Sequence, residues 1–358
     1  MKKIAIIHTI GLQYEGITSV IYNYCSNMDM DGLEFYFISS GTVQKDIKNK
    51  FQNLGRIYET SNRKKHTFNY CKEIYRILKK HKFDVVHIHG NSGTMMIETT
   101  ISKICGIRKI LVHCHNTNCR HPYLNKIMAP VMKMTSDVYL ACSNEAARWL
   151  FGNSKYIVLK NSINVQMFQF NAGIRSFYRK EMKLEDCFVI GHVGHFTEQK
   201  NHDFIIDIFK HITNKEPKAR LLLIGDGPYL KKIQEKAKAY KLTDKIVFTG
   251  VRKDITELYN VIDIFLLPSK WEGLPLVMLE AQASGLPLLV SDVITKEAKC
   301  TKKVFYKSLE DSSKNWAEKI LEIKSNNYIR QESFSEDLKK RGFDIKSETI
   351  KLKKIYIS

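Results

Sequence analysis

The chain has 358 residues, of which 44% are hydrophobic and 26% charged. These fractions exclude a disordered, collagen-like or low-complexity protein, and the length predicts two domains that fold without disulfide support. The formal net charge of +20 favours an anionic partner: a nucleic acid, an acidic membrane surface or a phosphorylated ligand.

The amino terminus predicts a buried strand instead of a secretion signal. Ile4–Ile7 follow two lysines, but this apolar run ends at His8, short of the ~7–15 residues of a signal-peptide core. No apolar run approaches the ~20 residues of a membrane span. The eight cysteines contain no C-x-x-C pair, so we interpret most of them as reduced, buried residues. We therefore expect a soluble, cytoplasmic protein.

Short apolar runs alternate with amphipathic helical patterns along the chain. Six predicted strands lie in the first half: Ile4–Ile7, Phe35–Ile38, Val85–Ile88, Ile110–His113, Val138–Ala141 and Ile157–Leu159. Six more follow in the second half: Phe188–Val193, Leu221–Ile224, Ile246–Phe248, Ile264–Leu267, Leu288–Ser291 and Val304–Tyr306. Apolar strands that alternate with helices are typical of parallel sheets covered on both faces. The pattern predicts two doubly wound α/β domains.

Turn-forming residues between Asn161 and Asp186 predict the domain boundary. We assign residues 1–165 to the N-terminal domain and residues 166–342 to the C-terminal domain. Residues 343–358 predict a helix that packs back toward the N-terminal domain, with apolar positions among lysines.

Four loops that contain glycine follow predicted strands: Gly11–Gly16, Gly194–Asn201, Gly225–Pro228 and Pro268–Pro275. Ligands of open α/β sheets bind beyond the carboxyl ends of the strands. Glycine lets backbone N–H groups approach a phosphate, and helix N-termini attract anions. The four loops together predict a phosphorylated ligand between the two domains, although Gly225-x-Gly227 by itself is more often a turn.

Two glutamates flank a predicted helix start at Pro275. Glu272 lies in the preceding loop, and Glu280 lies about a turn and a half inside the helix, leaning back toward the same edge. Carboxylates at these places can accept hydrogen bonds from hydroxyl groups while the helix N–H groups hold a diphosphate. A ligand with hydroxyls and a diphosphate is a nucleotide sugar; the alternative is two solvated glutamates near a helix start.

The segment Glu272–Gly285 resembles the E-x7-E signature of the family-4 retaining glycosyltransferases of the GT-B fold, and in particular those of bacterial capsule and exopolysaccharide synthesis. Further matching segments are Ile190–Phe196, Gln199–Asn201 and Phe248–Arg252 and, more loosely, Glu15–Ile17, Asp84–Gly90 and His113–Thr117. The resemblance implies two Rossmann-like domains with a cleft between them. The N-terminal domain would bind the acceptor, and the C-terminal domain the nucleotide sugar.

The resemblance also implies residue roles. The implied catalytic residues are Glu272, at the donor sugar's C3 and C4 hydroxyls, and His115, which would orient that sugar. Glu280 would bind the ribose. The implied diphosphate and base contacts are Gly16, His195, Lys200, Val251, Arg252, Gly273, Leu276 and Val277. At His195 the family commonly has Arg, which is always charged and can bond two phosphate oxygens.

The predicted enzyme is a hexosyltransferase that moves a sugar from a nucleotide sugar to a saccharide acceptor. The resemblance implies that the donor is a UDP-sugar and that the acceptor is linked to a polyprenyl diphosphate. It also implies retention by front-face attack, which fits a sequence in which we identify no obvious carboxylate nucleophile. We expect no metal or other cofactor, no nucleic-acid partner, and peripheral binding to the anionic inner face of the membrane, since residues 1–160 carry a net +12. A nucleotide-sugar epimerase of the same fold and a non-catalytic nucleotide-sugar binder remain alternatives.

Three other motifs have simpler interpretations. The pairs His87/His89 and His113/His115 could bind a metal, but no carboxylate or thiol pattern completes a known site. Asp29-Met30-Asp31 precedes a glycine and predicts a turn. The basic runs Arg63–His66 and Lys79–Lys82 lack interleaved aromatic residues and predict a solvated or membrane-facing surface.

Overall fold

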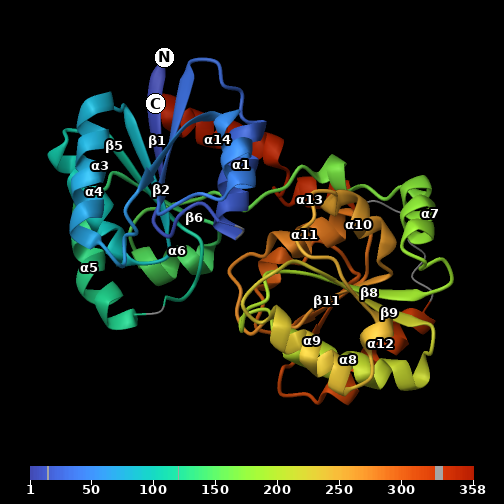
Figure 1. The fold of residues 1–358 in the computed structure, drawn as a ribbon. Helices are drawn as coiled ribbons and strands as arrows, with labels where there is room; N and C mark the ends of the chain where they lie inside the picture. Colours follow the sequence, from blue (N-terminus) through green and yellow to red (C-terminus); the bar gives the residue numbers. More distant parts are fainter. Residues whose placement is uncertain (14–15, 120, 327–333) are drawn as a thin grey trace. The chain divides into compact units, whose positions relative to one another are not determined.

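The computed structural model describes residues 1–13, 16–119, 121–326 and 334–358, and it divides the chain into two compact units (Figure 1). Unit 1 comprises Met1–Ser162 and Ile345–Ser358, and unit 2 comprises Ile163–Asp344. Each unit contains one parallel β-sheet flanked by helices, which confirms the predicted fold class. Within the described residues, no helix is long and apolar enough to cross a membrane.

Unit 1 has a seven-stranded parallel sheet in the order β3-β2-β1-β4-β5-β6-β7. Its strands are β1 (Lys2–His8), β2 (Leu33–Ser40), β3 (Gly55–Thr60), β4 (Val85–Gly90), β5 (Lys109–Cys114), β6 (Val138–Ala141) and β7 (Ile157–Val158). Its α-helices are α1 (Gly16–Asn27), α2 (Lys45–Gln52), α3 (Thr67–His81), α4 (Met96–Ile104), α5 (Pro122–Met134), α6 (Asn144–Phe151) and α14 (Ile345–Ile357). A short 3-10 turn, η1 (Gly93–Met95), precedes α4.

The prediction of six strands in the first half was wrong, because it missed β3. This edge strand pairs only with β2, and of its six residues only Thr60 is fully buried. Its sequence Gly-Arg-Ile-Tyr-Glu-Thr therefore lacks the continuous apolar run of a strand that is covered on both faces.

Unit 2 has a six-stranded parallel sheet in the order β10-β9-β8-β11-β12-β13. Its strands are β8 (Phe188–Val193), β9 (Ala219–Ile224), β10 (Ile246–Phe248), β11 (Ile264–Leu267), β12 (Leu288–Ser291) and β13 (Val304–Lys307). Its α-helices are α7 (Ala172–Glu181), α8 (His202–Lys215), α9 (Leu230–Ala239), α10 (Ile255–Val261), α11 (Leu276–Ala283), α12 (Ser313–Ser325) and α13 (Ser335–Lys340). Its 3-10 turns are η2 (Val165–Phe168), η3 (Thr243–Lys245) and η4 (Lys296–Ala298).

The apolar residues of α8 recur at helical spacing and lie in the core of unit 2. Ile205, Ile208 and Ile212 of α8 are fully buried beside Trp316 of α12, with β8 and β9 beneath them. Side-chain caps fix several helix starts; for example, Asn171 Oδ1 accepts the Ile174 N–H at 2.9 Å at the start of α7. Such a cap satisfies one of the N–H groups that the first helical turn leaves unpaired.

Two smaller predictions had different outcomes. Asp29 and Asp31 form a turn, in which Asp29 Oδ1 accepts the Asp31 N–H at 3.1 Å, and Lys353 of α14 pairs with Asp29 at 2.7 Å. The eight cysteines are free thiols, but only four are fully buried, so the expectation that most are buried was wrong.

Candidate active site

The strand order of unit 2 brings two loops together. β8 and β11 are neighbours in the sheet, with β9 and β10 on one side of them and β12 and β13 on the other. The strand order reverses at this point, and ligands of open α/β sheets bind at such a topological switch point. The loop 194–201 follows β8, and the loop 268–275 follows β11. They are joined where the Lys270 N–H donates to Gln199 O at 2.8 Å and Asn201 Nδ2 donates to Pro268 O at 3.1 Å.

Lys200 and Glu272 meet between these loops. Lys200 Nζ lies 2.5 Å from Glu272 Oε1, and the two side chains are 16% and 8% exposed. Gln199 Nε2 donates to Glu272 Oε2 at 3.1 Å and to Trp271 O at 2.9 Å. Two donors from the opposite loop, Gln199 and Lys200, thus hold the carboxylate. The Lys200 cation can also bind an anionic oxygen of a ligand.

Glu280 lies on α11 and is bonded to α10. Tyr259, which is fully buried, donates from its hydroxyl group to Glu280 Oε2 at 2.7 Å. Burial raises the pKa of the Glu280 carboxyl to about 7, although the Tyr259 hydrogen bond and the charge of Lys200 act in the opposite direction. Glu280 therefore changes charge near neutral pH. Its ionised form accepts hydrogen bonds through both oxygens, whereas its protonated form carries an O–H donor on one of them.

The N-terminus of α11 lies between the two glutamates in sequence. The helix begins at Leu276, one residue after the predicted start at Pro275, which is its N-cap and whose carbonyl accepts the Met278 N–H at 3.1 Å. Leu276 and Val277 form the start of the helix, where N–H groups have no intrahelical acceptor, and Gly273 is half-buried just before it. A helix start of this kind attracts anions.

Glycines let the loops after β8, β9 and β10 pack backbone against backbone. Gly225 (φ +139°) and Gly227 (φ +156°) occupy a region that side chains disfavour. A Cβ at Gly225 would lie 2.1 Å from Gly194 O, and one at Gly227 would lie 2.6 Å from Phe196 N. The Gly225 N–H also bonds to Gly250 O at 3.0 Å. These glycines are explained by packing, which agrees with their interpretation as a turn.

Three other predicted residues of unit 2 lie at its surface. His195 is exposed in the loop after β8. Val251 is 46% exposed, and Arg252 beside it forms a two-point ion pair with Asp254, with N···O distances of 2.8 and 2.5 Å. Arg252 holds the pKa of the Asp254 carboxyl at about 2. Within the described part of unit 2, Arg252 therefore pairs with Asp254, and Lys200 pairs with Glu272.

The predicted residues of unit 1 lie at the carboxyl edge of its own sheet. Gly16 begins α1, and a Cβ there would meet no atom within 4 Å, so its surroundings are open. Glu15 lies outside the described residues. His115 follows β5 and is 6% exposed, and its Nε2 is 2.9 Å from His89 Nδ1. His115 is therefore positioned by a second histidine from β4.

His115 belongs to a row of buried imidazoles. His87, His89, His113 and His115 contact one another through their rings, and His87 Nδ1 lies 2.7 Å from the Tyr356 hydroxyl of α14. Burial lowers the pKa of His87 to about 3 and the pKa of the other three well below the ordinary value of 6.5. These histidines are neutral at physiological pH.

Three of these imidazoles are close enough to hold a metal ion: ligand atoms of His87, His89 and His113 lie within 4.8 Å of one another. However, the His87 and His113 rings are stacked at an interplanar angle of 7°, with centroids 5.4 Å apart. The lone pairs of stacked imidazoles lie in parallel planes, so one ring must rotate before both can point at one ion.

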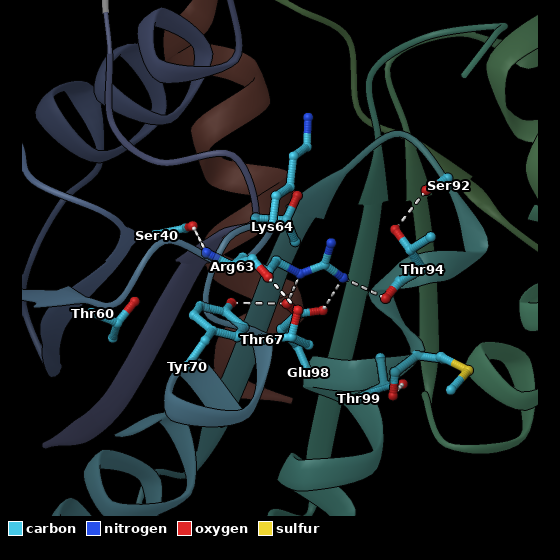
Figure 2. Close-up of polar contacts among 12 residues, drawn as sticks. Ser40, Thr60, Arg63, Lys64, Thr67, Tyr70, Ser92, Thr94, Glu98 and Thr99 are labelled. Carbon is cyan, nitrogen blue, oxygen red and sulfur yellow. Dashed lines mark hydrogen bonds and ion pairs between the residues drawn. The ribbon is translucent and has the colours of Figure 1, made fainter. Parts of the chain in front are cut away.

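A buried ion pair joins the loops at the same edge of unit 1 (Figure 2). Arg63 Nε lies 2.5 Å from Glu98 Oε1, the guanidinium also donates to Thr94 O, and the Tyr70 hydroxyl donates to Glu98 at 2.8 Å. The Arg63 N–H bonds to Ser40 Oγ at 2.9 Å. Arg63 thereby ties the loop after β3 to the end of β2 and to α4.

This pair corrects the interpretation of Arg63–His66 as a solvated or membrane-facing surface. Lys64, Lys65 and His66 are exposed, but the Arg63 side chain is only 11% exposed and Glu98 is fully buried. No local signal marks Arg63 as different from the two lysines after it, because its partner lies 35 residues away in sequence.

Comparison with known families accounts for most of the chain. The model of Glycosyltransferase Family 4 matches residues 14–166, and that of Glycosyl transferases group 1 matches residues 174–341. The chain therefore consists of these two glycosyltransferase domains and is a glycosyltransferase of the GT-B fold.

Individual proteins agree with this assignment. EpsF of Bacillus subtilis, whose name places it among the glycosyltransferases, is 27% identical over 98% of this chain and 96% of its own. The UDP-Gal:alpha-D-GlcNAc-diphosphoundecaprenol alpha-1,3-galactosyltransferase of Escherichia coli is 26% identical over 62% of this chain and 60% of its own. The structure of Anabaena HepE in complex with UDP and glucose has the same fold, with a TM-score of 0.82, 15% identity and 99% coverage of both chains.

Proposed function

We propose that this glycosyltransferase moves a hexose from a UDP-sugar, with retention, to a hydroxyl group of a saccharide acceptor in capsular or exopolysaccharide synthesis. The observation that carries the proposal is the arrangement at α11, where Glu272 beside Lys200 and Glu280 beside Tyr259 flank a helix N-terminus. This arrangement combines acceptors for sugar hydroxyls with donors for a diphosphate.

In the proposed reaction, an acceptor hydroxyl attacks the anomeric carbon on the face that the diphosphate leaves. The new C–O bond forms as the bond to the β-phosphate oxygen breaks, and the acceptor proton passes to that phosphate. Lys200 and the N–H groups of Leu276 and Val277 would stabilise the charge that develops on the leaving group, which is the main catalytic contribution of such fixed donors. Glu272 would hold the sugar hydroxyls, and His115 of unit 1 would orient the reacting sugar.

Two features support a membrane-associated acceptor. The galactosyltransferase to which part of the chain is similar is named for a diphosphoundecaprenol-linked acceptor. In addition, unit 1 contains 27 Lys and Arg against 12 Asp and Glu, so it carries +15 of the formal net charge of +20. A domain of this charge is attracted to an anionic membrane surface.

A thermal-shift panel of UDP-, GDP- and ADP-sugars tests the donor assignment. We expect a UDP-sugar to give the largest rise in melting temperature, because a ligand at about 100 times its Kd stabilises the folded state by about 2.7 kcal/mol. Because we propose no metal, EDTA should leave that shift and the transfer activity unchanged. Loss of both with EDTA would instead indicate a metal-dependent enzyme.

The same donor should bind more tightly as the pH rises through about 7. The Glu280 carboxyl has its pKa raised to about 7, and binding of ribose hydroxyls favours its ionised form. In Tyr259→Phe the carboxylate loses a hydrogen-bond donor, so the midpoint of the Kd–pH curve should move to higher pH. Calorimetry of a UDP-sugar, which has no phosphate pKa near neutrality, measures both curves.

Glu280→Gln is the control for the dependence of Kd on pH. Because this variant has no titrating carboxyl, it should bind the UDP-sugar more weakly and lose the change in Kd near pH 7. Parallel curves for the wild type, Tyr259→Phe and Glu280→Gln would show that Glu280 is not the group that titrates.

A further inference from the structure

The outward face of α5 is apolar although it is exposed. Tyr123, Leu124, Ile127, Val131 and Met134 are 84%, 46%, 72%, 39% and 82% exposed, respectively. At ~100° per residue these five side chains fall within an arc of about 100° around the helix. We call them the α5 apolar stripe.

The stripe is not needed for the packing of α5 within unit 1. Ala129 and Met132 lie on the opposite side of the helix and are buried, so α5 already has an inner apolar face. Single exposed apolar side chains are common on protein surfaces, whereas a continuous row of them marks a surface that contacts something else.

Exposed cations lie on α5 and at the end of the neighbouring helix α4. Lys126 is exposed on α5. Lys103, which pairs with Asp137 at 3.6 Å, and Arg108 are exposed at the end of α4, where Ile104 is also 65% exposed. α4 and α5 are adjacent in unit 1 (Figure 1), and the Thr99 and Thr135 hydroxyls bond between them at 2.6 Å. An apolar row with basic residues at its margin is typical of a helix that lies in the interface of a membrane.

We propose that the α5 apolar stripe inserts into the headgroup region of an anionic lipid bilayer, with the neighbouring cations at the lipid phosphates. The charge of unit 1 favours this occupant over a second copy of the chain, because two domains with a net +15 each would repel one another. Tyr123, with an apolar ring and a polar hydroxyl group, suits the interface between lipid and water.

The direction of α5 indicates what membrane binding would do for the enzyme; this step rests on the proposed function. The helix begins after the carboxyl end of β5, so Tyr123 and Leu124 lie at the same edge of the sheet as His115. Insertion of the stripe would hold this edge at the membrane surface. A lipid-linked acceptor could then reach the loops around His115 without leaving the bilayer.

Vesicle sedimentation tests the stripe directly. The probes are vesicles of phosphatidylcholine with about one third phosphatidylglycerol, and vesicles of phosphatidylcholine alone. We expect the wild type to prefer the anionic vesicles, and the triple variant Tyr123→Ser, Ile127→Ser, Met134→Ser to bind them at least about tenfold more weakly. The matched control Met167→Ser, Phe177→Ser, Val293→Ser removes three exposed apolar side chains of unit 2 and should bind like the wild type.

A reporter variant, Ile127→Trp, should shift its fluorescence to shorter wavelength on anionic vesicles. Equal binding by the wild type and the stripe variant would overturn the proposal. So would sedimentation velocity that shows a dimer in the wild type and a monomer in the stripe variant, because the stripe would then cover a second copy. Neither assay needs turnover, so their failure is distinct from a failure of the UDP-sugar panel.

Discussion

Acidification from pH 7.5 to pH 5 is expected to unfold unit 1 before unit 2. Unit 1 buries His87, His89, His113 and His115, each with a lowered pKa. The first three line a small cavity with Tyr24, Cys25 and Tyr356, which are uncharged at these pH values. Unit 2 has two comparable residues, His192 and His202, with pKa values lowered to about 3 and about 2.

The sign of this effect follows from the direction of the pKa shifts. A histidine whose folded pKa lies below its unfolded value of ~6.5 stabilises the fold fully above that value and less as the pH falls below it. For His87, with a folded pKa of about 3, the loss at pH 5 is about 2 kcal/mol. The pKa values of His89, His113 and His115 are lowered in the same direction, so unit 1 loses stability through four buried histidines and unit 2 through two.

Hydrogen exchange measured by mass spectrometry at pH 7.5 and pH 5, corrected for intrinsic rates, follows each unit separately. His113→Phe removes one titrating ring of similar size and should lower the pH at which unit 1 opens. His66→Gln changes an exposed histidine of the same unit and should not. If unit 2 opened at a higher pH than unit 1, the row of buried histidines would not be the cause of acid unfolding.

The sequence allowed the sheets to be predicted wherever burial is continuous. Leu221–Ile224 is apolar, and Val85–Ile88 is apolar except for the buried His87, because helices cover both faces of their strands; both lie in the structure as predicted. Gly55–Thr60 was missed because an edge strand does not need that pattern. A continuous apolar run therefore indicates a strand that helices cover on both faces. A strand without such cover lacks the run and is missed.

The candidate site was predictable only in part, for a related reason. Glu272 and Glu280 are eight residues apart, so one helix start relates them, and their placement around Pro275 follows from local geometry. Their partners are remote in sequence: Lys200 is 72 residues from Glu272, and Tyr259 is 21 residues from Glu280. Such pairs depend on strand order, which periodicity does not determine.

Glu272→Gln is expected to lower kcat by about 10²-fold or more, which corresponds to about 2.7 kcal/mol of transition-state stabilisation. The amide has nearly the shape of the carboxylate, but it lacks the charge that strengthens hydrogen bonds from the donor's hydroxyl groups. The affinity for free UDP should change little, because UDP has no sugar at that position. Lys200, released from its carboxylate partner, would remain available to the diphosphate.

Steady-state kinetics with a UDP-sugar, together with calorimetry of UDP, separates these two effects. Glu280→Gln should show the opposite pattern, with a clear loss of UDP affinity, because its proposed partner is the ribose that UDP retains.

Glu198→Gln is the matched control. Glu198 lies in the same loop as Lys200, pairs with Lys270 at 3.0 Å and is 61% exposed, so its replacement should leave both kcat and the UDP affinity near wild type. If Glu272→Gln and Glu280→Gln weakened UDP equally, the two glutamates would share one role in nucleotide binding. The residue that contacts the sugar would then have to be sought elsewhere, with His115 of unit 1 as the next side chain to replace.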